Sequence, residues 1–586
     1  MTHLAFPYRL AVFCIFFLGG CAPYTEKYAD SNLPLQISIL AFNDLHGNLE
    51  PPHLSVHETV EGKIIEVPAG GIAYLANAID QLKKQHPLNA VVSAGDMIGA
   101  SPLISAMFLD EPTIEAVNAM RIDFNAIGNH EFDKGFAELK RMREGGCSQH
   151  TRIQPCKVNK DFAGATFEFL AANVKNDNGQ TIFPAYGIKI FKQGKHQVKV
   201  GFVGMTLKGT PNIVTPEGVK GLVFEDEAST ANELVPVLKA QGVSALVLVI
   251  HEGGTVQGGP NDSNCPGLTG DIVPILHRLD PAYDVVVSGH THRAYTCDFK
   301  KFNPSKSFLL SSAGQYGSLL THIDLKIDPI RQQVVSKSAH NVIIQSESFT
   351  NSAGVQIKNT RALPQFIKNQ EVQRIVSVYQ EASALETQRP VSHLPQSITR
   401  QASASRETPL GNLIADAQWA ATAAPENGNS DFALMNQGGV RADLLIQVGG
   451  GTVNYGQLFK IQPFSNYLVV KSFTGLQIQE MLEQQYSNPQ RLRILLPSSN
   501  LRYQVNMENA AGHRVSQISI KGLRLEPTQI YRITMNNFLG SGGDGFGIFK
   551  AGVLVFSGGL DVDALVDYLV QHPGIPPPST DRITRM

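Results

Sequence analysis

Short apolar runs separated by polar, glycine-rich segments characterise the first half of the chain. Runs such as 36–42 (QISILAF), 90–93 and 244–250 (SALVLVI) are short and mostly apolar, which is typical of buried strands in a parallel sheet. Between the first two runs, residues 71–84 repeat apolar positions every three or four residues, as an amphipathic helix does. Strands that alternate with helices predict a layered α/β sandwich.

The same reasoning extends over the rest of the chain. It predicts further strands at 124–127, 167–173, 198–203, 284–288, 308–312 and 321–327, and helices at 113–120, 135–144, 271–279, about 365–385 and 410–422. Because 586 residues are too many for one hydrophobic core, we expect two domains. We assign residues 35–345 to a first α/β domain, 346–386 to a linker helix, 387–572 to a second α/β domain and 573–586 to a loosely ordered tail.

The amino terminus has the pattern of an export signal. Arg9 precedes an apolar run at 10–20 that is about half as long as a membrane span. The run ends in Leu18-Gly19-Gly20-Cys21, which resembles the bacterial lipobox, whose cysteine becomes lipidated. A plain secretion signal with an incidental cysteine is the alternative. We predict a signal peptide at 1–20, a tether at 21–34, a membrane anchor on Cys21 and a periplasmic or cell-surface location.

Four cysteines follow this segment, at Cys147, Cys156, Cys265 and Cys297. An even number in an exported chain indicates disulfides. All three pairings stay open, and so do four free thiols. Because no C-x-x-C spacing occurs, a zinc site made of these cysteines is not expected.

Composition narrows the classes of partner. The hydrophobic fraction of 42% and the formal net charge of −2 are ordinary for a soluble globular protein. Because the charge is close to neutral, composition gives no reason to expect a nucleic acid duplex as partner. Composition leaves the oligomeric state open.

Five of the predicted strands end on polar side chains that bind metals or phosphate. These side chains are Asp44, His46, Asp96, Asn129, His130, His251, His290 and His292. One such residue carries little information, but parallel strands bring their carboxyl ends to one edge, where ligands bind in α/β sheets. Imidazoles with carboxylates suit zinc, manganese, iron or cobalt better than calcium. We therefore expect a metal site at this edge.

Two metal ions fit this set better than one. The candidate ligands exceed the four of a closed zinc site, and a shared carboxylate, for which Asp96 is the natural choice, holds two cations about 3.5–4 Å apart. Two divalent ions against the carboxylates of Asp44 and Asp96 leave a net positive charge. Such a site attracts a phosphate dianion.

The blocks 43–47 (NDLHG), 95–97 (GDM), 128–131 (GNHE), 251–253 (HEG) and 289–292 (GHTH) resemble those of the calcineurin-like metallophosphoesterases. Their order and spacing resemble the 5′-nucleotidase family of bacteria and animals, over nearly all the chain after the signal. The resemblance implies a four-layer αββα sandwich followed by a second α/β domain that selects the substrate. It implies one metal at Asp44, His46, Asp96 and His292, and another at Asp96, Asn129, His251 and His290.

In the same resemblance, His130 and Asp133 form a catalytic pair and are not ligands. A cationic His130 can donate a hydrogen bond to a phosphoryl oxygen as charge grows in the transition state. Asp133 can orient the ring and favour its charged form. Asp133 is also a suitable N-cap for the helix expected at 135–144, and both roles are compatible. The resemblance implies that a metal-activated water attacks phosphorus.

The second domain is expected to recognise the nucleoside. The resemblance implies that Phe464 and Phe538 sandwich the base and that Asp544 contacts the ribose. Stacking on aromatic rings is a common way to hold a base, although either Phe is otherwise an ordinary core residue. The remaining predicted substrate residues are Arg406, Asn436, Arg441 and Asn466.

Two positions depart from the family pattern. Relatives often have a substrate arginine where this chain has Ala404, and Arg406 is the candidate replacement. Relatives often have glycine where Asn500 follows Ser499. These differences bear on the fit of the nucleoside and not on phosphoester hydrolysis.

The sequence thus predicts an exported enzyme that uses two divalent transition-metal ions (zinc, manganese, cobalt or iron) to release phosphate from nucleoside 5′-monophosphates, with di- and triphosphates as further substrates. Alternatives on the same scaffold are a 2′,3′-cyclic nucleotide phosphodiesterase and 3′-nucleotidase, a UDP-sugar hydrolase and a sulfur-compound hydrolase. A non-enzymatic surface binding protein is more remote, because a decayed enzyme should have lost some of these ligands.

Overall fold

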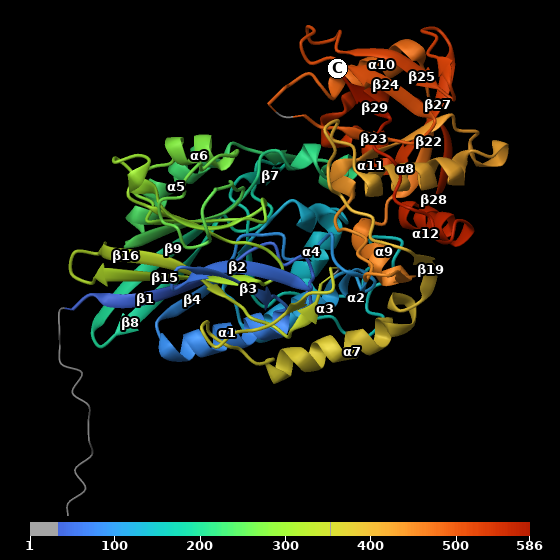
Figure 1. The fold of residues 1–586 in the computed structure, drawn as a ribbon. Coiled ribbons are helices and arrows are strands. Elements are labelled where there is room, and N and C mark those ends of the chain that lie inside the picture. The colour runs from blue at the N-terminus through green and yellow to red at the C-terminus, as the bar shows by residue number, and fades with distance from the viewer. Residues whose placement is uncertain (1–32, 352, 491) are drawn as a thin grey trace, which may run out of the picture.

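The computed structural model describes residues 33–351, 353–490 and 492–586. The predicted signal peptide, Cys21 and most of the tether lie outside the described residues. Within those ranges, no helix combines the length and the apolar character that crossing a bilayer requires. The chain forms two lobes, one blue to yellow and one orange to red, with the linker helix α7 (Gln370–Thr387) along the first lobe (Figure 1).

The first lobe contains two six-stranded sheets. In spatial order, the first sheet consists of β16 (Gln333–Ile343), β15 (Leu319–Asp328), β1 (Leu35–Phe42), β4 (Asn89–Ser93), β5 (Phe124–Ala126) and β6 (Glu168–Leu170). The second sheet consists of β13 (Ala294–Asp298), β14 (Leu309–Ala313), β12 (Val285–Ser288), β11 (Ala245–His251), β9 (His196–Thr206) and β8 (Tyr186–Gln193).

The two sheets pack face to face, and helices cover their outer faces, which gives four layers. Successive side chains of a strand point to opposite faces, so Ile37 and Ile39 of β1 meet Val247 and Val249 of β11 in the core between the sheets. Leu40 faces outward against α1 (Ile72–Gln85) and α3 (Glu111–Met120). On the other side, α5 (Glu227–Ala240) and α6 (Ile272–Arg278) cover the second sheet. The predicted αββα sandwich is confirmed.

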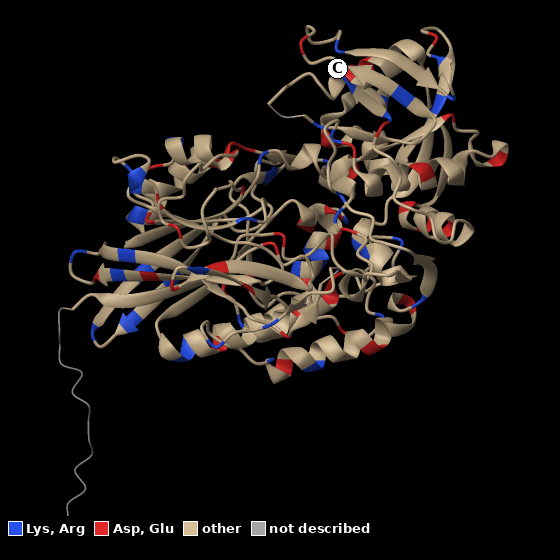
Figure 2. Ribbon diagram, in the orientation of Figure 1, with Lys and Arg blue, Asp and Glu red and all other residues tan. Residues whose placement is uncertain are grey.

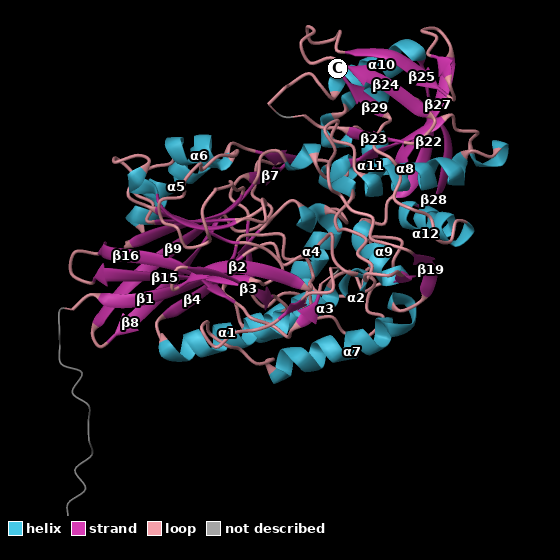
Figure 3. Ribbon diagram, viewed as in Figure 1, coloured by secondary structure: helices cyan, strands magenta, loops and turns pink. Residues whose placement is uncertain are grey.

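The second lobe is a separate α/β domain, as predicted (Figure 3). Its five-stranded sheet has the order β23 (Leu495–Pro497), β20 (Phe432–Asn436), β27 (Ile530–Asn536), β22 (Tyr467–Thr474) and β28 (Val553–Leu560). Helices α8 (Pro409–Thr422), α9 (Tyr455–Ile461) and α12 (Asp561–Gln571) share a core with one face. The other core contains α10 (Gly475–Gln484) and the sheet β26 (Leu523–Arg524), β25 (Val515–Ile520), β24 (Leu501–Val505) and β29 (Ile583–Arg585).

Short elements complete the chain. Paired strands are β2 (Leu54–Val60) with β3 (Lys63–Ala69), β7 (Val174–Asn176) with β10 (Leu222–Phe224), β17 (Phe349–Thr350) with β18 (Gln356–Ile357), and β19 (Pro390–Leu394) with β21 (Gly451–Asn454). The remaining α-helices are α2 (Leu103–Ala106), α4 (Phe136–Glu144) and α11 (Asn537–Gly540). Basic and acidic residues are interspersed over both lobes (Figure 2).

Three expectations need correction. The tail is not loose, because Arg582 is buried in an ion pair with Asp416 (2.6 Å) and Ile583 pairs with Tyr503 of β24. The linker helix starts at Gln370 and not near 365, because the Asn369 side chain accepts a hydrogen bond from Val372 N and caps it. The strand ends that carry the predicted ligands come from two sheets and not from one sheet edge.

The four cysteines that follow the predicted signal peptide form two disulfides. Cys147 bonds to Cys156, and Cys265 bonds to Cys297. The prediction of disulfides is confirmed, and the pairing that the sequence left open is resolved.

Candidate active site

Five loops meet at one end of the sandwich, after β1, β4 and β5 of the first sheet and after β11 and β12 of the second. Backbone hydrogen bonds join them directly. His46 N donates to Asp96 O (2.9 Å), and His290 N donates to the Asp44 carboxylate (2.9 Å). His130 N donates to Asp96 Oδ1 (2.9 Å). The loops therefore form one connected framework, although they come from different sheets.

Left-handed backbone conformations recur in this framework. Among the predicted metal ligands, positive φ angles between 47° and 71° occur at Asp44, His46, Asp96, His290 and His292. Residues with a side chain seldom adopt such angles, and each costs on the order of 1–3 kcal/mol. Because strain of this kind clusters at functional sites, it supports a role for these loops beyond connecting strands.

Glycines allow the loops to approach one another. A side chain at Gly128 would collide with the Asp96 carboxylate, and one at Gly99 would collide with the backbone of His130. Gly99 also has a φ of +84°, which other residues disfavour. The glycines next to the predicted ligands are thus required by close packing.

The predicted ligands converge into two groups. Donor atoms of Asp44, His46 and His292 lie within 4.8 Å of one another, and so do those of Asp96, His251 and His290. Asp96 Oδ2 lies 3.0 Å from His251 Nε2 and 3.6 Å from His46 Nε2. Asp96 therefore lies between the two groups, in contact with a histidine of each.

The side chains of these groups fit divalent transition metals. His46 Nδ1 lies 2.9 Å from Gly99 O and His251 Nδ1 lies 2.7 Å from Ala94 O. Because a carbonyl oxygen only accepts, each Nδ1 must donate, which leaves each Nε2 lone pair directed into the cluster, as in metal-binding histidines. Asn129 Oδ1 is buried and has no hydrogen-bond partner among the described residues. All of these atoms are available for coordination.

His130 and Asp133 form the expected pair. His130 Nδ1 lies 2.9 Å from Asp133 Oδ2. Burial lowers the pKa of His130, but the carboxylates of Asp133 and Asp96 outweigh burial and raise it above its usual value. Asp133 does not cap α4, since α4 begins after Gly135 and Asp133 accepts from Ala100 N (3.1 Å). Of its two expected roles, the structure shows only the contact with His130.

A cavity of about 220 Å³ joins this pair to the second domain. First-domain residues on its wall include Asn129, His130, Asp133 and His290. Six predicted substrate residues line it from the second domain: Asn436, Arg441, Phe464, Asn466, Phe538 and Asp544. Phe464 stacks on His130, with ring centroids 5.7 Å apart and planes 17° from parallel. The two domains thus share one cavity.

Arg406 is the exception among the predicted substrate residues. It is exposed, does not line the cavity, and its carbonyl accepts a hydrogen bond from Gln437 Nε2 (3.0 Å). Its φ of 67° belongs to the turn before α8, in which Arg406 N donates to Ser403 O (2.9 Å). Arg406 thus lies outside the cavity in this arrangement, and its replacement of an arginine at Ala404 stays a prediction.

Sequence reasoning missed two groups that support the site. The buried Glu131 carboxylate accepts hydrogen bonds from Asp96 N (3.0 Å), Met97 N (2.9 Å) and Gly128 N (2.8 Å). Asn536 donates to Asn436 Oδ1 (2.9 Å), and Asn436 donates to Asp544 Oδ2 (2.7 Å). Glu131 could have been found from the sequence, because it directly follows His130 in the motif. Asn536 could not, because only the fold places it beside Asn436.

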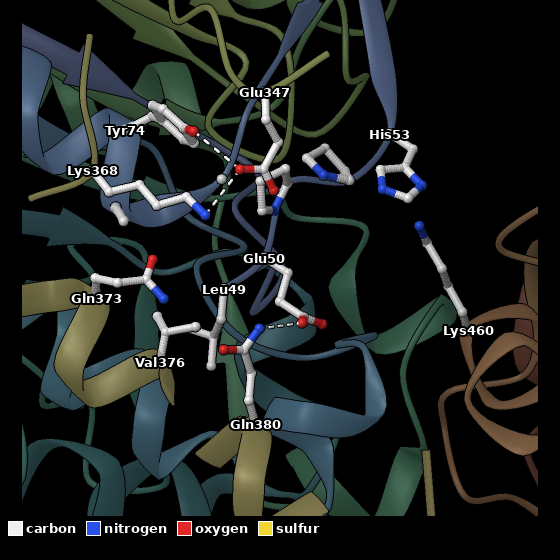
Figure 4. A pocket seen from close by; sticks show the side chains of 14 residues that line it. Leu49, Glu50, His53, Tyr74, Glu347, Lys368, Gln373, Val376, Gln380 and Lys460 are labelled. Atoms are coloured by element: carbon white, nitrogen blue, oxygen red, sulfur yellow. Dashed lines mark hydrogen bonds and ion pairs between the residues drawn. The ribbon is translucent and has the colours of Figure 1, made fainter. Parts of the chain in front are cut away.

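A second cavity, of about 300 Å³, lies between residues 49–53, α1, α7 and α9. Figure 4 shows Tyr74 and Lys368 bonded to Glu347, with Lys460 of the second domain directed toward His53. Its wall carries none of the predicted site residues. This cavity belongs to the interface between linker helix and domains and not to the candidate active site.

An αββα sandwich with this cluster at its strand ends defines a metallophosphoesterase, and comparison with known proteins agrees. Residues 37–294 match the family model of calcineurin-like phosphoesterases, and residues 382–551 match that of the 5′-nucleotidase C-terminal domain. The chain is 30% identical to Cell wall protein Lmo0130 of Listeria monocytogenes over 94% of its own length and 69% of that protein. It is 25% identical to a 5′-nucleotidase of Vibrio cholerae, over 94% and 93% of the two chains.

A solved structure shows the same fold. The 5′-nucleotidase precursor of Thermus thermophilus superposes with a TM-score of 0.71 at 23% identity, covering 94% of this chain and 99% of that one. The chain therefore belongs to the 5′-nucleotidase family of metallophosphoesterases and is a hydrolase of that family.

Proposed function

We propose that the chain is an exported nucleotidase that releases phosphate from nucleoside 5′-monophosphates. The observation that carries this proposal is the shared cavity, in which Phe464, Phe538 and Asp544 face the same space as His130 and Asn129. An aromatic and acidic wall suits a base and a ribose, while the opposite wall suits a phosphate. Di- and triphosphates of the same nucleosides are further substrates of this site.

In this proposal, Asp44, His46, Asp96 and His292 hold one divalent ion, and Asp96, Asn129, His251 and His290 hold a second. The convergence of their donor atoms supports that assignment. When bound, the ions supply Lewis acidity and activate water for attack on phosphorus. Carboxylate and imidazole donors suit zinc, manganese, cobalt and iron.

The chain's own residues orient the phosphate and balance its charge. His130, held by Asp133, donates from Nε2 to a phosphoryl oxygen and stabilises the charge that grows in the transition state. Arg441 lies over the Phe464 ring (5.7 Å), which places a second cation at the wall between base and phosphate. Asp133 acts through His130 as a positioning residue.

The two disulfides in the described part of the chain support export, because disulfides persist in oxidising compartments. The Listeria relative is named a cell wall protein. We retain the lipid anchor on Cys21 and a periplasmic or cell-surface location as parts of the proposal. Membrane contact is then through the anchor only.

A nucleotide-sugar or other pyrophosphate substrate is a second candidate. A further cavity of about 440 Å³ adjoins His292 and is lined by Tyr316, Arg293, Arg400, Arg441 and Lys460. This cavity lies beside the ligand group of Asp44, His46 and His292. It gives room for a second anionic group attached to the scissile phosphate. This observation favours pyrophosphates over cyclic nucleotides as additional substrates.

The test is a substrate panel with the purified chain loaded separately with zinc, manganese, cobalt or magnesium. We expect phosphate and adenosine from AMP, at higher kcat/KM than from 2′,3′-cyclic AMP or UDP-glucose. No adenosine from AMP with any of the four metals would contradict the proposal. Faster cleavage of UDP-glucose than of AMP would favour the second candidate.

A further inference from the structure

Three histidines and an aspartate gather on the outer face of the first sheet, away from the active site. The His322 ring lies between two others, with centroids 4.7 Å from His86 and 5.1 Å from His340. Its Nε2 lies 3.6 Å from Asp324 Oδ1. Donor atoms of His86, His322 and Asp324 all lie within 4.8 Å of one another.

Strand register and one loop build this cluster. His322 of β15 pairs directly with His340 of β16, and Asp324 projects on the same face because it is two residues along the strand. His86 is the C-cap of α1. The loop after it is fixed by a hydrogen bond from Ser38 N of β1 to Leu88 O (2.9 Å). Three separate elements thus direct metal-binding groups to one point.

We propose that this cluster is a third metal site, which binds a divalent ion of the zinc class through His86, His322 and Asp324, with His340 as fourth ligand. Three imidazoles and a carboxylate are a tetrahedral donor set that zinc accepts. The His322 side chain is only 6% exposed, so its nitrogen is shielded from competing water. The carboxyl end of α1, where His86 lies, adds a favourable negative potential for a cation.

One existing contact must give way. Ser38 Oγ lies 2.5 Å from His322 Nε2, so metal coordination at that nitrogen replaces this hydrogen bond. The hydroxyl can rotate about its Cβ without moving the strand, and it then becomes a neighbour of the ion. The exchange of one hydrogen bond for a metal–nitrogen bond is local.

The site is distinct from the candidate active site. Ser38 lies four residues before the end of β1, which corresponds to about 13 Å at 3.3 Å per residue, and Asp44 lies in the loop beyond that end. No ligand is shared between the two clusters. A metal here links the end of α1 to β15 and β16, so it stabilises the first domain and takes no part in hydrolysis.

Zinc per chain, measured by mass spectrometry after gel filtration of the full chain, tests this site. His86 is partly exposed and His340 is exposed, so changing either to alanine leaves the core intact. His57→Ala, at an exposed position on β2, is the matched control. We expect His86→Ala to bind one zinc fewer than wild type and the control, with AMP hydrolysis within twofold. We also expect zinc to raise the melting temperature of the first domain less in this variant.

Cobalt gives an independent readout. Titration of wild type should show visible absorption bands of a tetrahedral ion with histidine ligands, and these should weaken in His86→Ala and His340→Ala. Equal zinc content in wild type, His86→Ala and the control would overturn the third site. A zinc loss accompanied by loss of AMP hydrolysis would also overturn it, because the ion would then belong to the active site.

Discussion

His130 contacts both halves of the active site: its backbone binds Asp96, and its ring meets Asp133 and Phe464. In His130→Ala we expect kcat for AMP to fall by about 10²–10³, as for removal of one donor to a developing oxyanion. Metal content should stay at the wild-type value, because the backbone contact to Asp96 remains. Loss of metal from this variant would show that His130 is a ligand.

Phe464 and Phe538 line the cavity from the second domain. Removing one stacking ring should cost about 1–3 kcal/mol of nucleotide binding. We therefore expect Phe538→Ala to raise KM for AMP at least fivefold, while hydrolysis of an aryl phosphate without a base changes less than twofold. Equal losses on both substrates would contradict base stacking. Phe464→Ala should affect both somewhat more evenly, since this ring also contacts His130.

At the scale of elements, the loops after the strands depend on their glycines. Gly128→Ala should displace the Asp96 carboxylate, so we expect loss of bound active-site metal and at least a hundredfold fall in AMP hydrolysis. Gly547→Ala is the matched control, because a side chain there meets open space. Normal metal content in Gly128→Ala would show that the close approach is not required.

Helix α12 carries a buried acid at its first position. Asp561 is 1% exposed, and burial raises its pKa to about 8. Because the folded pKa lies above the unfolded value, the folded state keeps the proton and loses stability as pH rises from about 4 to about 8. Asp561→Asn should remove this loss. The free energy of unfolding of this variant should match that of wild type near pH 4 and exceed it increasingly toward pH 8, by up to about 1.4 kcal/mol per pH unit. A difference that does not change with pH would contradict this account.

The elements that the sequence predicted best were those with one buried face and a clear period, such as β1, α1 and β11. Strands with mixed or exposed faces escaped prediction, as in β16, where exposed and buried positions alternate irregularly. The carboxyl-terminal strand β29 was missed because proline-rich residues precede it, whereas its order comes from pairing with β24 and from the buried Arg582–Asp416 pair. Tertiary contacts, and not the local sequence pattern, determine whether such segments form strands.

At the scale of the whole molecule, the candidate active site combines a ligand cluster of the first domain with a cavity that both domains line. Local motifs identified the residues on each side, but no local pattern relates His130 to Phe464, which come within stacking distance across the interface. The linker helix helps to fix that interface, because Tyr379 packs on Phe108 (5.0 Å) and bonds to Glu115 (3.2 Å) of the first domain. Arg406 shows the converse, since it occupies a motif position but does not line the cavity.

The most direct test of this account is anomalous diffraction from crystals of the zinc-loaded chain with a non-hydrolysable AMP analogue. We predict two anomalous peaks on either side of the Asp96 carboxylate, the phosphate next to them and within reach of His130, and the base between Phe464 and Phe538. A single peak at this position, or a nucleotide whose base lies outside the cavity between the domains, would contradict it.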